Sequence, residues 1–123
     1  MRAVTFDPAI DRFAVRDLPV PEPGPGAVRV RVEACGLNPV DAKIIYWKGA
    51  AVDMNANWVP GLDVAGVIDA FGPGVAGWQP GDRVLYHGNM FQPHGGFAWQ
   101  TAAPWWLLPG FSAPVDAHRT GAL

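Results

Sequence analysis

The density of glycine and proline constrains this chain more than any other feature of its sequence. The 123 residues include 15 Gly and 13 Pro, almost a quarter of the chain and about twice the usual share. Both residues oppose long helices, because proline lacks a backbone N–H and glycine loses the most conformational freedom on folding. The chain is also 50% hydrophobic and 16% charged, which is too apolar for a disordered protein. We therefore expect one mainly β domain of short strands joined by turns.

The charges and the single cysteine exclude several classes of protein. Nine Lys and Arg against eleven Asp and Glu give a net charge of −2, which provides no basic field for nucleic acid. No apolar run approaches the roughly 18 residues of a membrane-spanning helix, and the first residues lack the pattern of a signal peptide. The single cysteine, Cys35, excludes an internal disulfide and agrees with a reducing compartment. We expect a cytoplasmic protein without nucleic acid or membrane as a partner.

Alternation of apolar and polar residues predicts most of the strands. It is clearest at residues 28–33, where three valines face one side and three charged residues face the other. Weaker alternation and short β-rich runs occur on both sides of this segment, bounded by glycine and proline turns. In total we expect about seven to nine short strands, the others lying at residues 2–6, 13–18, 62–71, 82–86, 96–103 and 105–108.

One stretch carries the start and stop signals of a helix. Asn38 fits an N-cap, Pro39 the first helical position, and Asp41 the place where a carboxylate stabilises the N-terminal end. Gly49 provides a stop. These signals predict a helix over residues 39–48.

The segment 50–60 has no clear period and is expected to form a loop that exposes Trp58. The chain has six tryptophans, more than a core of this size needs, and aromatic rings are often used at interfaces and ligand mouths. Core packing accounts for part of them. One interpretation is therefore an interaction surface on the loops around Trp47, Trp58 and Phe91.

A GxGxxG pattern occurs at Gly72, Gly74 and Gly77, directly after a predicted strand. In dinucleotide-binding proteins such glycines let the backbone approach a pyrophosphate at the N-terminus of a helix. Here Pro80 and Gly81 form another turn before the next strand, so the required helix is missing. The pattern predicts a connection between two strands.

The chain offers four soft or borderline metal ligands, Cys35, His87, His94 and His118, and no pair of them has zinc-finger spacing. Cys35 with two of the histidines would satisfy the three-ligand minimum of a catalytic zinc. However, Cys35 ends the valine strand, where a small buried side chain is expected, and the histidines fall in loops rich in glycine and proline. We therefore expect no metal site.

Four motifs, in order, resemble the N-terminal GroES-like domain of medium-chain dehydrogenases and reductases. They are CGLNPVDAK (35–43), PGLDVAGVI (60–68), PGDRV (80–84) and GGFAWQ (95–100). The resemblance implies that residues 1–109 form a GroES-like, partly open β-barrel with one or two short helices. In that family this domain is the substrate side of a cleft whose other wall is a Rossmann domain that carries NAD(P)H.

The resemblance also points to a zinc-free branch. The zinc-dependent alcohol dehydrogenases have a cysteine ligand at the position of Asn38 and a histidine ligand at the position of Leu62. Leucine cannot coordinate a metal, and a neutral amide is a poor zinc ligand. The motifs GLNPVD and PGLDVAG instead resemble the quinone oxidoreductases, which implies reduction of quinones or enones by hydride transfer from NADPH.

Hydride transfer to a conjugated acceptor needs orientation and a hydrogen-bond donor near the oxygen that becomes negative. We expect Asn38 to supply that donor through its amide NH₂, with the hydroxyl of Tyr46 as a second candidate. Asp41 completes the expected catalytic residues, although its helical position favours bracing of the Asn38 turn over proton transfer. No cofactor-binding residue is identifiable from the sequence.

The resemblance falls short of a whole enzyme. A Rossmann domain needs over about 100 further residues, whereas residues 110–123 offer only a tail with signals for a short helix. We therefore expect a substrate-side domain that lacks its nucleotide-binding partner, does not bind NADPH tightly and is inactive alone. An apolar face left uncovered favours homo-oligomers. The alternative is a free-standing, non-catalytic binding or interaction module.

The missing ligands predict that the protein carries no zinc. A catalytic zinc needs three protein ligands and a structural one needs four, and the sequence provides no such set. Metal analysis of protein purified without added zinc should therefore find well below one equivalent per chain. One bound equivalent would contradict this prediction.

Overall fold

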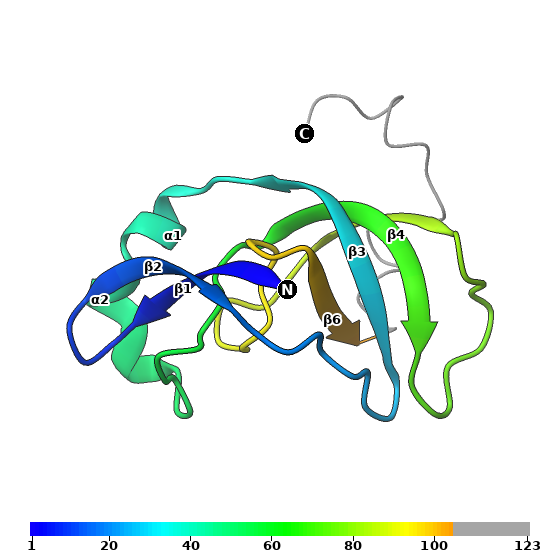
Figure 1. The fold of residues 1–123 in the computed structure, drawn as a ribbon, viewed down its shortest axis with the longest axis horizontal. Coiled ribbons are helices and arrows are strands. Elements are labelled where there is room, and N and C mark those ends of the chain that lie inside the picture. Colours follow the sequence, from blue (N-terminus) through cyan, green and yellow to red (C-terminus); the bar gives the residue numbers. More distant parts are fainter. Residues whose placement is uncertain (105–123) are drawn as a thin grey trace.

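The structure is a computed structural model that describes residues 1–104. Its elements in chain order are β1 (Arg2–Asp7), β2 (Arg12–Asp17), β3 (Ala27–Gly36), α1 (Pro39–Ala42), α2 (Ile44–Trp47), the 3₁₀ helix η1 (Lys48–Ala50), β4 (Asp63–Phe71), β5 (Arg83–His87) and β6 (Gln100–Pro104) (Figure 1). Strands predominate and the helices are short. The mainly β fold predicted from the sequence is confirmed.

The strands form two antiparallel sheets. β1 and β2 make a hairpin, and the other four strands follow the order β5-β4-β3-β6. In Figure 1 the long, curved strands β3 and β4 lie side by side, while the hairpin and the short helices gather at one end of the molecule. Among residues 1–104 the two sheets do not join into one closed sheet. The architecture is therefore the partly open barrel that the resemblance implied.

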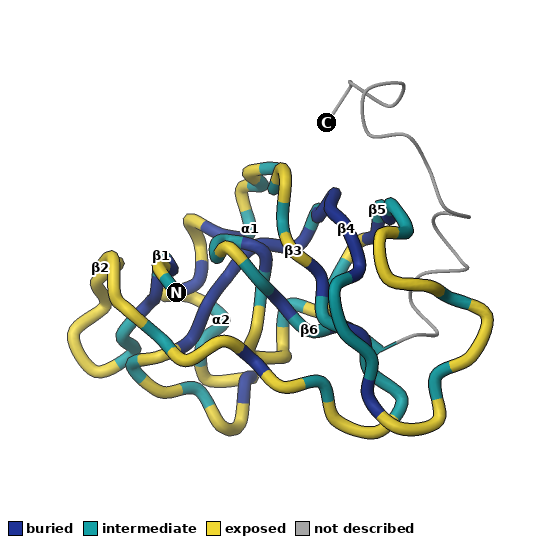
Figure 2. The backbone as a smooth tube through the Cα atoms, turned by 45° about the vertical axis from the view of Figure 1, so that its right-hand side comes forward, coloured by how far each residue is buried: buried dark blue, intermediate teal, exposed yellow. Residues whose placement is uncertain are grey.

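Two isolated bridges hold the hairpin against the rest of the domain. Ala3 pairs with Ala98, and Phe6 pairs with Trp58. Strand β1 therefore has partners on both sides. Strand β2 is exposed along its whole length, as its yellow colour in Figure 2 shows.

The core of the larger sheet follows from the alternation in β3. Val28 and Val30 are fully buried, whereas Arg31 between Val30 and the next valine is exposed. The two valines belong to a cluster with apolar residues of the neighbouring strands. The other buried members of this cluster are Val64, Ile68, Val84, Tyr86 and Ala103.

The helix predicted over residues 39–48 is divided into two short helices. Lys43 separates α1 from α2, with φ −90° and ψ 14°, which lies outside the α-helical region. The N–H of Tyr46 donates to the carbonyl of Lys43 at 2.9 Å, a spacing typical of the tighter 3₁₀ helix. Helical structure also continues through the expected stop at Gly49 as η1. None of the helices within residues 1–104 has the length and apolar character needed to cross a bilayer.

Trp58 is buried, so the prediction of an exposed Trp58 was wrong. Its exposed fraction is 2%, and it packs in a second core cluster with Phe6, Ile44 and Ala51. The N–H of Phe6 donates to the backbone carbonyl of Trp58 at 2.8 Å. This bond holds the tryptophan inside. It comes from β1, far away in the sequence, and the local pattern of residues 50–60 carries no sign of it.

The remaining strand predictions hold with one change. The strands predicted at residues 2–6, 13–18, 28–33, 62–71 and 82–86 correspond to β1 to β5. The strand predicted at 96–103 begins only at Gln100, because the preceding residues turn toward the hairpin, where Ala98 bridges to Ala3. The strand predicted at 105–108 and the tail at 110–123 lie outside the described residues.

The GxGxxG pattern forms the connection between β4 and β5, as predicted. The two strands it joins are antiparallel neighbours. Gly74 and Gly77 have φ values of 83° and 87°, which glycine adopts without steric cost. At Gly72 an added Cβ would lie 1.8 Å from the carbonyl oxygen of Gly24. These glycines therefore serve a tight turn and a close backbone contact.

Gly66 lies where β4 passes close to β3, so a side chain at this position is expected to destabilise the fold. An added Cβ would lie 2.2 Å from the backbone oxygen of Arg31 and 2.8 Å from Val30 Cγ1. The variant Gly66→Ala should lower the free energy of unfolding by about 1–3 kcal/mol, measured by urea denaturation. Gly49→Ala is the matched control, because nothing lies within 4 Å of its added Cβ. An equal loss in the two variants would contradict the prediction.

Candidate functional site

Four polar side chains gather where three strands and a helix meet. β3 ends at Gly36, which pairs with Asp63 at the start of β4, and Asp63 pairs with His87 at the end of β5. The chain then leaves β3 and enters α1 with Asn38 as the N-cap. Asn38, Asp41, Asp63 and His87 thus form a polar cluster.

Within the polar cluster, Asp41 braces the start of α1. Its carboxylate accepts the backbone N–H of Asn38 at 2.9 Å, and its own N–H donates to the backbone oxygen of Asn38 at 3.0 Å. A backbone hydrogen bond from Gly61 also reaches it. The bracing predicted for Asp41 is confirmed by these contacts, whereas a role for Asp41 in catalysis stays a prediction.

Asp63 joins Asn38 to His87. The amide nitrogen of Asn38 donates to Asp63 Oδ2 at 2.8 Å. On the other side, His87 Nδ1 lies 2.6 Å from Asp63 Oδ1. Each oxygen of the carboxylate therefore has its own partner, and the three side chains form one continuous hydrogen-bonded row.

Hydrogen bonding and burial shift the two carboxyl groups in opposite directions. The pKa of Asp63 is lowered, mainly by the hydrogen bond from Asn38 and next by that from His87. The pKa of Asp41 is raised, mainly by burial, against the backbone hydrogen bonds from Asn38 and Gly61. Asp63 is therefore ionised at neutral pH. Because an ionised carboxylate only accepts hydrogen bonds, His87 Nδ1 is the donor in their contact.

Cys35 packs against the core of the larger sheet but is only half-buried, less than the buried side chain predicted for the end of the valine strand. Burial raises the pKa of its thiol to about 12, and the negative charges of Asp41 and Asp63 add to the shift. The thiol is therefore protonated at neutral pH, and it lacks the thiolate character of a reactive cysteine.

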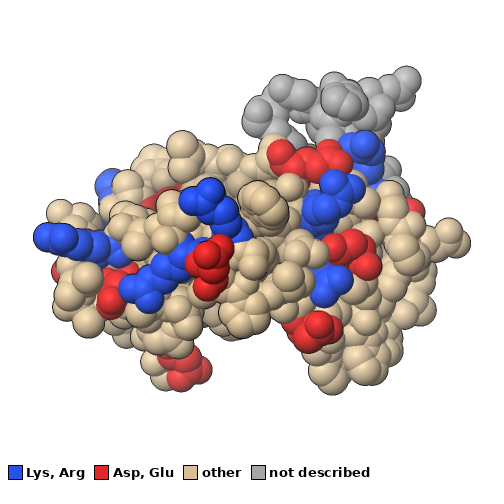
Figure 3. Space-filling model, viewed as in Figure 1, with Lys and Arg blue, Asp and Glu red and all other residues tan. Residues whose placement is uncertain are grey.

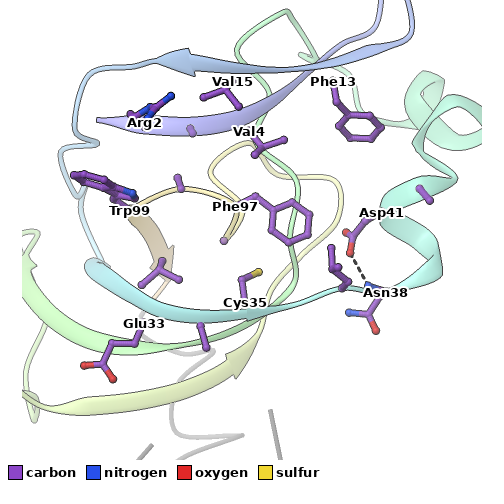
Figure 4. Close-up of a pocket in the computed structure, with 17 residues that line it drawn as sticks. Arg2, Val4, Phe13, Val15, Glu33, Cys35, Asn38, Asp41, Phe97 and Trp99 are labelled. Atoms are coloured by element: carbon purple, nitrogen blue, oxygen red, sulfur yellow. Dashed lines mark hydrogen bonds between the residues drawn. The ribbon is translucent and has the colours of Figure 1, made fainter.

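An open apolar groove lies beside the polar cluster, between the hairpin and the end of β3 (Figure 4). Its volume is about 920 Å³. Several of its apolar side chains are exposed, and the pocket is thus able to take an apolar ligand or partner. The exposed apolar residues that line it are Phe13, Val15, Leu37 and Trp99.

The three predicted catalytic residues do not share one place. Asn38 and Asp41 both contribute to the lining of the groove, but the carboxamide of Asn38 turns away from the groove (Figure 4). Its nitrogen donates to Asp63. Tyr46 is 81% exposed and does not line the groove. The structure therefore brings Asn38 and Asp41 together and leaves Tyr46 on the surface of α2.

Asp63 and His87 are the residues of the cluster that the sequence did not reveal. Asp63 stands inside the motif PGLDVAG, and His87 was considered only as a metal ligand. The strands that carry them were predicted, but the register that sets them opposite each other depends on how the β4–β5 connection is folded. The sequence did carry one sign of this contact: Asp63 and His87 are polar residues at the ends of two strands that follow each other in the chain.

The donors of this region do not fit a catalytic zinc ion. Leu62 is 7% exposed and has no donor atom, and the amide nitrogen of Asn38 is bonded to Asp63. Within the part of the chain that the structure describes, no three His, Cys, Asp or Glu side chains are grouped to hold a metal ion. Of the other candidate ligands, His94 lies in the loop between β5 and β6, and His118 is outside the described residues.

The motifs, the partly open barrel and the site agree with one protein family. The model of the alcohol dehydrogenase GroES-like domain matches residues 24–108, more than half of the chain. The chain belongs to this family. The resemblance drawn from the four motifs is confirmed.

The relatives of this GroES-like domain include enoyl and quinone reductases. It is 46% identical over 81 residues to the trans-enoyl reductase FMN2 of Fusarium mangiferae, covering 66% of this chain and 20% of that protein. It is 39% identical over 71 residues to the quinone oxidoreductase of Sus scrofa, covering 56% and 21% of the two chains. A solved quinone oxidoreductase of Pseudomonas syringae pv. Tomato DC3000 superposes with a TM-score of 0.75 at 28% identity, covering 99% of this chain and 37% of that chain. The GroES-like domain therefore spans about a fifth of these curated relatives.

The charged side chains on the face shown in Figure 3 are mixed in sign. Several basic residues of the domain are paired with acidic ones, as in the contacts of Arg29 with Asp69 at 2.7 Å and of Arg83 with Glu33 at 2.8 Å. Neighbouring opposite charges cancel at a distance. That face therefore carries no extended basic field of the kind that binds a phosphate backbone.

The lowered pKa of Asp63 predicts how the cluster responds to acid. A carboxyl group with a lower pKa in the folded state stabilises the fold above its ordinary pKa of about 3.9. This contribution is lost as the pH falls through the lowered value. Asn38→Ala should raise the pKa of Asp63, measured by ¹³C NMR of its carboxyl carbon, because it removes the principal donor. Asn57→Ala replaces an exposed loop asparagine and should leave this pKa unchanged. An Asp63 pKa that stays low in Asn38→Ala would contradict the prediction.

Proposed function

We propose that this GroES-like domain is the acceptor-binding, substrate-side part of a zinc-independent, NADPH-dependent oxidoreductase that reduces quinones or enones. The names of its relatives, quinone oxidoreductases and trans-enoyl reductases, support this reaction class. The share of those relatives that it spans supports its role as one part of a larger catalytic unit.

The observation that carries the proposal is the state of the Asn38 carboxamide. Asn38 and Leu62 stand where the zinc-dependent members of the family hold metal ligands. The amide NH₂ has two hydrogens, and one is donated to Asp63. Within residues 1–104 the other has no partner. A fixed N–H of this kind can donate to an acceptor carbonyl oxygen and stabilise the negative charge that the oxygen gains on reduction.

The other two predicted residues have supporting roles in this proposal. Asp41 holds the backbone of Asn38 in place through the contacts at the start of α1. Tyr46 is exposed on the surface of α2. Its hydroxyl can donate a hydrogen bond to the quinone or enone only if that substrate extends across the helix. Asn38 is thus the donor that we place at the reacting carbonyl.

The described residues do not fit a nicotinamide nucleotide. The GxGxxG glycines form a turn between antiparallel strands, and no helix of residues 1–104 begins there to receive a pyrophosphate. Holding a nicotinamide close to the acceptor accounts for roughly 7 to 11 kcal/mol of a reaction barrier. The domain alone is therefore inactive, and NADPH would supply the hydride only when another domain holds it.

The apolar groove supports a second candidate, a non-catalytic binding or interaction module. Phe13, Val15 and Trp99 expose apolar surface there, and a groove of about 920 Å³ is of the size that small ligands occupy. Trp58 is buried, so its ring is not available to a partner of such a module. The two candidates predict different contact residues, because the Asn38 carboxamide turns away from the groove.

A titration of the ¹⁵N-labelled chain with duroquinone tests the proposal. This fully methylated quinone is a poor target for addition of the Cys35 thiol. We expect a saturable shift of the Asn38 side-chain NH₂ signals, which the control variant Asn57→Ala keeps; in Asn38→Ala, binding followed through the backbone amide signals near residue 38 should be weakened. Shifts confined to Phe13, Val15 and Trp99 would favour the interaction module.

A parallel titration with NADPH tests whether this domain lacks a nucleotide site of its own. NADPH fluorescence should show no saturable binding in the micromolar range, because the described residues have no site for the pyrophosphate. Micromolar binding to the chain would contradict our interpretation of the glycine turn.

A further inference from the structure

The apolar groove beside the hairpin is elongated along β1 and β2. In the register of the hairpin, Arg2 lies opposite Asp17, and Phe13 lies opposite Phe6. Arg2 and Phe13 both line the groove, and Figure 4 shows them toward opposite ends of it. At the rise of a β-strand, the path from Arg2 to Phe6 covers about 13 Å. A groove of this shape suits a chain-like ligand.

Uncharged side chains line the groove between these ends. Val4 and Val15 are cross-strand partners in the hairpin, and Figure 4 shows Phe97 and Cys35 across from them. The thiol of Cys35 is protonated at neutral pH and adds no charge. Val15 is 60% exposed and Trp99 is 66% exposed. An apolar ligand that covers these side chains would remove their apolar surface from water, which favours binding.

The charged groups at the Arg2 end of the groove favour an anion. Arg2 is exposed, and among residues 1–104 its guanidinium has no hydrogen bond or ion pair, not even with its cross-strand neighbour Asp17. Glu33 also lines the groove, but its carboxylate is paired with Arg83 Nη1 at 2.8 Å. Within the described residues, this end therefore offers a positive charge that is not yet neutralised.

The opposite end of the groove disfavours an anion. Asp41 lies there (Figure 4), and its carboxylate accepts the backbone N–H of Asn38 at 2.9 Å. Of the lining that residues 1–104 provide, Arg2 is the one Lys, Arg or His side chain. A second anion beside Asp41 would be repelled, whereas an uncharged chain would not. The charges therefore give the groove a direction, with the anion-binding end at Arg2.

We propose that the groove binds an amphipathic carboxylic acid, with its carboxylate at Arg2 and its apolar chain running along Val15 toward Phe13. A guanidinium binds a carboxylate through two parallel N–H donors, and the ring of Trp99 covers the chain next to that contact. The groove volume of about 920 Å³ lies within the range of small-molecule sites. The inference gives the groove a ligand class and does not depend on the reduction proposed for Asn38.

Titration of the ¹⁵N-labelled chain with octanoate tests the proposal. We expect saturable shifts of the Val15 backbone amide and of the Trp99 indole N–H signal. The uncharged analogue 1-octanol has the same chain and should bind about fivefold more weakly, because it lacks the ion pair with an exposed guanidinium. The duroquinone titration follows the Asn38 signals, so either ligand can fail to bind at its site without affecting the result for the other.

Arg2→Met removes the charge and keeps an unbranched side chain. It should weaken octanoate binding about fivefold and leave 1-octanol binding unchanged, so that the two ligands bind alike. Arg12→Met is the matched control, because Arg12 is an exposed arginine of the same hairpin that does not line the groove. This variant should keep the preference for octanoate. Far-UV circular dichroism checks the fold of each variant, and the comparison of the two ligands on the wild-type chain needs no variant.

Several results would overturn the proposal. They are octanoate that causes no saturable shift of the groove signals, equal affinities of octanoate and 1-octanol for the wild-type chain, and a preference for octanoate that persists in Arg2→Met. Another occupant of the groove would overturn it as well. Groove signals that shift on dilution without ligand would indicate a second copy of the chain, and nuclear Overhauser contacts from residues 105–123 to Val15 or Trp99 would indicate that this segment fills the groove.

Discussion

The pairing of β3 with β4 is the contact on which the rest of the domain depends. It joins the strand with the clearest alternation to the strand that carries Gly66, and the two backbones approach so closely there that a Cβ does not fit. The buried valines of β3 pack against Ile68 and Val64 of β4 across this pair. The same register sets Gly36 opposite Asp63, and so places the start of α1 next to the start of β4.

The candidate site is therefore formed where the ends of three strands meet, and no single sequence motif contains all of its residues. Asn38 follows β3, Asp63 opens β4 and His87 closes β5, so each side chain is carried by a rigid element that is itself paired. Asp41 ties the N-cap to the loop at Gly61. Side chains anchored on paired elements in this way keep their directions.

The donor of this site is a neutral amide, whose electrostatic effect differs from that of a metal ion. A zinc ion offsets nearby carboxylates by its own charge, whereas a neutral amide does not. The site retains two carboxylates, Asp41 and Asp63, beside the amide donor. His87 lies against the other oxygen of Asp63 and donates to it. The apolar groove lies on the other side of Asn38, and its exposed side chains are suited to apolar contacts.

The sequence by itself determined β1 to β5, the glycine turn after β4 and the bracing contact of Asp41, because each depends on residues close together in the chain. Four short motifs in the sequence also identified the family. Only the tertiary structure decided the burial of Trp58, the break at Lys43, the groove beside the hairpin and the row from Asn38 to His87. Three of these features arise where segments distant in sequence meet, and the break at Lys43 depends on exact backbone angles. Alternation and turn signals fix which residues form a strand, but not the partner or register that brings one side chain to another.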